Sequence, residues 1–81
     1  MLAEDNELNA EIATEILDEV GIQVEWANDG IIAVDMMAKA PAGHYDLVFM
    51  DIQMPNLDGY GATKRIRSLD DPAKANIPVV A

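Results

Sequence analysis

The sequence predicts an α/β protein with an open parallel sheet and alternating helices. Leu47, Val48, Phe49 and Met50 form an unbroken apolar run, which is typical of a short parallel strand covered on both faces. Segments with helical spacing separate this run from other short apolar segments. Strands and helices therefore alternate in the order β-α-β-α-β-α-β, and right-handed crossovers are expected between the strands.

The first two elements are a short strand and an amphipathic helix. Residues 1–3 are a brief apolar segment, shorter than a buried parallel strand usually is. Over residues 7–20 apolar side chains recur at helical spacing, with Asn6 as the expected N-cap and Gly21 just beyond the C-terminus. The apolar positions of this helix are Leu8, Ile12, Ala13, Ile16, Leu17 and Val20.

A second strand and a second helix are expected next. Residues 22–26 alternate between apolar and polar side chains, which indicates a strand at the edge of the sheet. Trp26 in this strand is interpreted as a packing residue whose indole would serve as a fluorescence probe. Asp29 and Gly30 predict the start of a helix over residues 31–40. Its buried stripe is expected to consist of Ile31, Val34, Met37 and Ala38.

The last part of the chain predicts a third helix and a fourth strand. Asp58-Gly59 predicts a turn and the start of a helix over residues 60–69. The side chains expected to face inward are Ala62, Ile66 and Leu69. Pro72 ends this helix, because the residue before a proline disfavours α geometry. Residues 77–81 predict the strand, with Pro78 near its start.

Acidic residues follow two of the predicted strands. Asp51 comes directly after the apolar run, and Glu4 and Asp5 come after the first strand. The carboxyl ends of parallel strands meet at one edge of an open sheet, where such folds place their ligand sites. Taken alone, Asp51 is better explained as a residue that ends a strand and caps a turn. Three neighbouring carboxylates repel one another and call for a cation, and their oxygen ligands suit Mg²⁺.

These segments resemble the receiver domain of two-component response regulators and hybrid histidine kinases. The resemblance rests on Glu4-Asp5-Asn6 before an amphipathic helix, and on the string of residues 51–55, DIQMP, followed by Asp58-Gly59. It covers residues 1–81 as one domain. It implies a flavodoxin-like sheet, here with the strand order 2-1-3-4.

The resemblance also implies a site and a reaction. Asp51 would be the phosphoacceptor, and a histidine kinase or phosphotransfer domain would be the phosphodonor. Mg²⁺ would be held by Glu4, Asp5, Asp51 and the backbone carbonyl of Gln53. Receivers catalyse their own aspartyl phosphorylation, so turnover of a separate substrate is not expected. The lone histidine, His44, is interpreted as a solvated loop residue rather than as a phosphodonor.

Against the family pattern, the C-terminal third of a receiver is expected to be absent. The family places a Ser or Thr after the fourth strand, and a phosphate-binding Lys after the fifth, whereas this sequence ends at Ala81. We expect a truncated receiver with weakened Mg²⁺ binding and impaired phosphorylation. An exposed sheet edge would promote a homo-oligomer such as a dimer.

Composition restricts the partners. Fifteen acidic residues against five basic ones give a formal net charge of −10, which argues against binding to nucleic acid or to an anionic membrane. The apolar runs are far shorter than the roughly 20 residues of a membrane helix. The absence of cysteine excludes disulfides and thiolate metal sites, and fits an expected cytoplasmic location.

Three classes of function stay open at this point. The first is a phosphoacceptor module of a stand-alone regulator or of a hybrid kinase, and the sequences of residues 51–60 and 62–67 resemble the hybrid type more closely. The second is an interaction or folding fragment that performs no transfer. The third is a metal-dependent hydrolase with an aspartate nucleophile. Gln53 argues against the hydrolase, because such enzymes carry a second acid two residues after the nucleophile.

Overall fold

A computed structural model describes residues 1–51, 54 and 56–80 of the chain. Its four parallel strands form one sheet in the order β2-β1-β3-β4, so the expected strand order and the edge position of β2 are confirmed. The strands are β1 (Leu2–Ala3), β2 (Trp26–Ala27), β3 (Val48–Met50) and β4 (Val79–Val80). The helices are α1 (Glu7–Glu19), α2 (Gly30–Lys39), α3 (Gly59–Arg67) and α4 (Pro72–Ala75).

Strand β3 lies inside the sheet, as its apolar sequence predicts. It pairs with β1 through Ala3 opposite Met50, and with β4 through Val48 opposite Val79. Val48 and Met50 are both buried. Asp51 therefore follows the last residue of a strand that has a neighbour on each side.

The first three helices begin at side-chain caps that the sequence predicts. Each capping side chain accepts a hydrogen bond from the backbone N–H three residues later, which satisfies one of the donors that a helix start leaves unpaired. The pairs are Asn6 with Asn9 at 3.1 Å, Asp29 with Ile32 at 2.8 Å, and Asp58 with Gly61 at 2.8 Å. These caps set the direction in which the chain leaves each strand.

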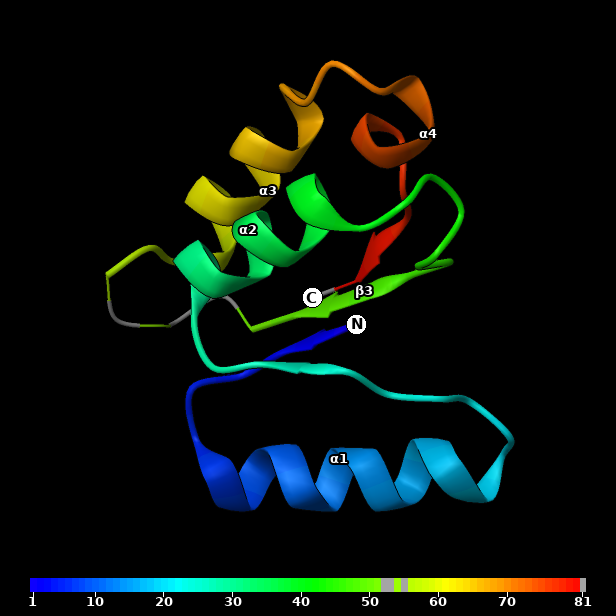
Figure 1. Cartoon of the computed structure of the whole chain (residues 1–81). Coiled ribbons are helices and arrows are strands. Elements are labelled where there is room, and N and C mark those ends of the chain that lie inside the picture. Colours follow the sequence, from blue (N-terminus) through cyan, green and yellow to red (C-terminus); the bar gives the residue numbers. More distant parts are fainter. Residues whose placement is uncertain (52–53, 55, 81) are drawn as a thin grey trace.

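The helices are distributed unequally over the two faces of the sheet. Helices α2, α3 and α4 lie on one face, and α1 lies alone on the other (Figure 1). The buried core belongs mainly to the first face, where Met37 of α2 and Ile66 of α3 join Val48 and Met50 of β3. Ile66 and Val48 are the largest fully buried side chains in the described part of the chain.

Helix α1 is confirmed, but its apolar stripe is not covered. Ala10 is the only α1 residue that is buried. Four of the predicted apolar positions are largely exposed: Leu8, Ile12, Ile16 and Val20. No other helix of the described chain lies on this face of the sheet (Figure 1), which agrees with the exposure of these four side chains.

The predicted buried face of α2 is partly wrong. Met37 is buried, but Ile31 and Ala38 are exposed and Ala33 is buried in their place. The helix begins at Gly30, one residue earlier than expected, and this glycine lies against the backbone of Leu57. Because Gly30 is the residue that approaches Leu57 closely, the neighbouring Ile31 faces solvent.

Other differences concern the ends of elements. The predicted strand over residues 22–26 is reduced to Trp26–Ala27, and the last strand covers Val79–Val80, while Ala81 lies outside the described residues. The short helix α4 was not predicted. Asp71 caps it and Pro72 occupies its first turn, where a missing N–H has no cost. Among the described residues, no helix is both long and apolar enough to span a bilayer.

Candidate functional site

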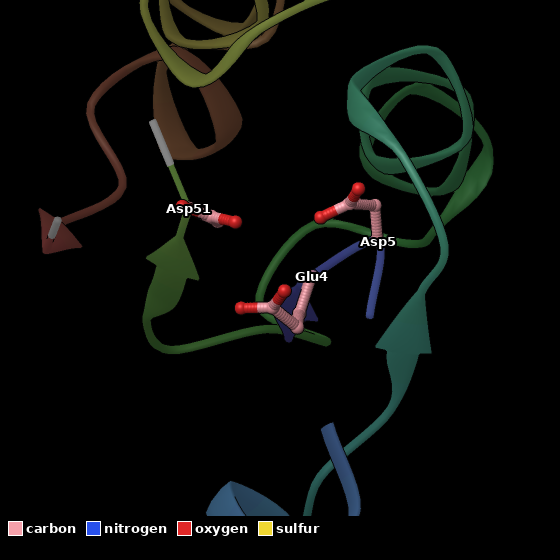
Figure 2. Close-up of side chains that lie close together, drawn as sticks. All are labelled: Glu4, Asp5 and Asp51. Carbon is pink, nitrogen blue, oxygen red and sulfur yellow. The ribbon is translucent and has the colours of Figure 1, made fainter. Parts of the chain in front are cut away.

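The three acidic residues singled out in the sequence meet at the carboxyl end of the sheet. Glu4 and Asp5 follow β1, Asp51 follows β3, and the two strands are neighbours. One carboxylate oxygen from each residue can be chosen so that all three lie within 4.8 Å of one another. Figure 2 shows the carboxylates of Asp5 and Asp51 directed toward one another, with Glu4 beside them. The predicted convergence is confirmed.

Backbone hydrogen bonds extend the sheet to these residues. The N–H of Asp51 donates to the Ala3 carbonyl at 2.9 Å, and the N–H of Glu4 donates to the Ala27 carbonyl at 3.0 Å. The N–H of Asn6 donates to the Glu4 carboxylate at 3.1 Å. Glu4 and Asp51 therefore sit on backbone that the parallel ladder holds in place, and Asp5 follows directly after it.

The electrostatics of the cluster favour a cation. Partial burial raises the pKa of the Glu4 carboxyl, the hydrogen bond from Asn6 lowers it, and the charges of Asp51 and Asp5 raise it. Both burial and charge crowding disfavour the ionised form of an acid. A divalent cation between the oxygens would remove that disadvantage, and an all-oxygen donor set suits Mg²⁺. The residues present therefore fit such a metal.

Contacts that the sequence did not predict join the start of α2 to Asn56 and Leu57. Asn56 has a positive φ of 68° and donates a hydrogen bond from its side-chain amide to the Asp29 carboxylate at 3.0 Å. A Cβ atom at Gly30 would overlap the Leu57 carbonyl oxygen. The start of α2 thus contacts Asn56 through Asp29 and Leu57 through Gly30. The Asn, Asp and Gly residues of these turns were the available signal in the sequence. No local sequence pattern, however, indicates that Asn56 pairs with Asp29, which lies 27 positions away.

Gln53 and Pro55 cannot be placed at this site, and His44 does not lie there. Gln53, predicted to contribute a backbone carbonyl, and Pro55 lie outside the described residues. His44 lies near the opposite end of the sheet, where its Nε2 is 2.7 Å from a carboxylate oxygen of Glu25. His44 is exposed, as the sequence analysis expected.

Comparison with known proteins identifies the family. The family model of the response regulator receiver domain matches residues 1–81. The chain belongs to this receiver family. It is 40% identical over 76 residues to hybrid signal transduction histidine kinase K of Dictyostelium discoideum, covering 94% of this chain and 6% of that protein. It is 38% identical over 69 residues to sensor histidine kinase RcsC of Escherichia coli K12, covering 85% of this chain and 7% of that protein.

Solved receiver structures share the fold of this chain. The receiver domain of sensor histidine kinase PA1611 from Pseudomonas aeruginosa PAO1, with a magnesium ion coordinated in its active site cleft, matches with a TM-score of 0.85 and 35% identity. The match covers 96% of this chain and 60% of that one. The signal receiver domain of a histidine kinase from Syntrophus aciditrophicus matches with a TM-score of 0.83 and 32% identity, covering 96% and 55%. The flavodoxin-like receiver fold is therefore confirmed.

Proposed function

We propose that this receiver is a phosphoacceptor module of a two-component phosphorelay, with Asp51 as the phosphoacceptor. The observation that carries the proposal is the convergence of Glu4, Asp5 and Asp51 within 4.8 Å at the end of the central strand. Asp51 is half-buried and follows β3, so its carboxylate reaches the mouth of the sheet while its backbone stays in the ladder.

The proposed reaction is a phosphoryl transfer between two side chains. A carboxylate oxygen of Asp51 attacks the phosphorus of a phosphohistidine on the donor protein, and an O–P bond forms. The N–P bond breaks, and its electron pair returns to the imidazole, which leaves and takes up a proton from solvent. The product is an aspartyl phosphate. Such transfers depend mainly on positioning and on electrostatic stabilisation.

We propose that Glu4, Asp5 and Asp51 hold Mg²⁺ together with the backbone carbonyl of Gln53, whose part rests on the family resemblance. When bound, the metal would supply positive charge that offsets the repulsion between an anionic carboxylate and an anionic phosphoryl group. The clustered oxygens and the raised pKa of Glu4 support this assignment. The magnesium ion in the cleft of the Pseudomonas receiver supports it further.

The partners follow from the relatives. The kinases to which the chain is similar are named as hybrid or sensor histidine kinases, so we propose a histidine kinase or phosphotransfer domain as phosphodonor in the cytoplasm.

The test is mass spectrometry of the chain after treatment with acetyl phosphate and Mg²⁺. Wild type should gain the mass of one phosphoryl group, and hydroxylamine should remove it, because acyl phosphates react with this nucleophile. Asp51→Asn should show no adduct. Asp46→Asn, which makes the same change in charge away from the cluster, should behave as wild type. An adduct that persists in Asp51→Asn would contradict the assignment.

A second candidate function is an interaction fragment that performs no transfer. The observation that favours it is the edge strand β4, which pairs with β3 alone among the described strands and leaves Val80 45% exposed. Exposed strand edges recruit other chains. A folded wild-type chain without any phosphoryl adduct would support this candidate over the first.

A further inference from the structure

Trp26, the only tryptophan of the chain, contacts the acidic site through its indole. The indole N–H donates a hydrogen bond to the backbone carbonyl of Glu4 at 2.7 Å, across 22 positions of sequence. The residue belongs to the edge strand β2 and is 41% exposed. Its ring borders a shallow recess whose other lining residues come from the first half of α1: Glu7, Ala10, Glu11 and Thr14. The sequence predicts Trp26 only as a packing residue, and gives no sign of this polar contact.

The carbonyl that accepts this hydrogen bond lies in the peptide unit that joins Glu4 to Asp5. A peptide unit is planar, so fixing its oxygen restrains the Cα atoms on both sides. The same segment is held by the hydrogen bond from the Glu4 N–H to Ala27 and by the bond from the Asn6 N–H to the Glu4 carboxylate. Two of these three contacts come from β2. The edge strand therefore holds the Glu4 backbone from both its N–H and its carbonyl.

We propose that Trp26 is a positioning residue of the acidic site, and that its indole reports when a divalent cation occupies that site. By holding the Glu4–Asp5 peptide, Trp26 keeps both carboxylates directed toward Asp51 before the cation arrives. The inference rests on the proposed function, since it takes the three carboxylates as the metal ligands. Indole emission responds to the hydrogen bond of its N–H and to the local electric field, and a cation beside Glu4 changes that field.

The experiment combines fluorescence with calorimetry on the same protein. Titration of wild type with Mg²⁺ should change Trp26 emission saturably, with the Kd that calorimetry gives, and Asp5→Asn should abolish the change. Trp26→Phe keeps an aromatic ring and loses the donor, so its calorimetric Kd for Mg²⁺ should rise by about two- to tenfold. Tyr45→Phe, which removes a polar group from an aromatic residue at the other end of the sheet, should bind as wild type.

A second substitution separates positioning from simple destabilisation. Because the chain has one tryptophan, benzothienylalanine can be incorporated at position 26 alone, which replaces the ring N–H by sulfur and keeps the ring size. Its Kd should rise as in Trp26→Phe while the circular dichroism spectrum stays that of wild type. If this variant bound Mg²⁺ with wild-type affinity and wild-type emission did not respond to bound Mg²⁺, the inference about Trp26 would be overturned. The proposed metal site would still stand. A wild type that binds no Mg²⁺ by calorimetry would overturn the proposed metal site and this inference together.

Discussion

Glu25 and His44 form a pH-sensitive contact at the end of the sheet opposite the acidic cluster. The hydrogen bond from His44 is the main reason why the pKa of Glu25 lies below its ordinary value of 4.5, although partial desolvation acts in the other direction. The Tyr45 hydroxyl and the N-terminal ammonium group lower the Glu25 pKa as well. A carboxyl whose pKa is lowered in the folded state stabilises the protein above its unfolded pKa, and this contribution is lost as pH falls through the folded pKa.

We therefore expect His44→Ala to raise the pKa of Glu25 toward its ordinary value. The free energy of unfolding of the variant should fall below that of wild type above the ordinary Glu25 pKa of 4.5, and the difference should shrink as the pH falls through the lowered pKa of Glu25 in the wild type. The difference should be small, because both side chains are exposed and such pairs are screened by solvent. A carbon-13 NMR titration of the Glu25 carboxyl measures the shift directly. Identical titration curves in the two proteins would contradict the prediction.

At the level of single residues, the sequence predicted where the three acids lie, but not the hydrogen bonds around them. Glu4, Asp5 and Asp51 could be brought together because parallel strands place their carboxyl ends at one edge, so knowing the strands was sufficient. The hydrogen bond from Trp26 to Glu4 was out of reach, because it depends on the register of β2 and on one side-chain rotamer. The pairing of Asn56 with Asp29 likewise depends on a loop conformation with positive φ.

At the level of whole elements, the start of α2 packs against the backbone of Leu57 at a glycine. A Cβ atom at Gly30 would overlap the carbonyl oxygen of Leu57, which is backbone and cannot rotate away. Gly30→Ala should therefore lower the free energy of unfolding by about 1–3 kcal/mol, the usual cost of overpacking, although alanine is the better helix former. Urea denaturation measures this change.

Gly61→Ala is the matched control for that substitution, because Gly61 also lies in the first turn of a helix that follows an aspartate cap. Its added Cβ would meet the Leu57 side-chain methyl group, which can move. The variant should stay within about 1 kcal/mol of wild type, since helix propensity and a minor adjustment oppose each other. Equal losses at positions 30 and 61 would show that the backbone contact of Gly30 is not special.

Helix starts were predictable where strand lengths and buried faces were not. Asn6, Asp29 and Asp58 act locally, on an N–H three residues away, so their identity is sufficient to mark a helix. The buried face of a helix depends on what lies opposite. Val20 follows the periodicity of α1 and is nevertheless 70% exposed, because the described chain offers it no partner.

For the molecule as a whole, the uneven coverage of the sheet favours association between copies, whereas the large negative charge opposes it. Apolar side chains are exposed on α1 and at the edge strand β4, and contiguous exposed apolar surface favours association. The formal charge of −10 makes two copies repel. Repulsion between exposed charges is screened by salt, with a Debye length of about 10 Å at 0.1 M, whereas the pairing of strand edges is not.

We therefore propose that the isolated chain forms a dimer through β4, and that the dimer fraction rises with ionic strength. Val80→Lys places a charge on the edge strand and should shift sedimentation equilibrium to the monomer, because charged edge residues prevent strand pairing. Val20→Lys makes the same substitution at an exposed site at the end of α1, so it reduces the net charge equally and should leave the dimer intact. If Val20→Lys dissociated the dimer and Val80→Lys did not, α1 rather than the strand edge would be the interface. A monomer mass at every salt concentration would overturn the association itself, since screening would then have removed the repulsion without revealing any attraction.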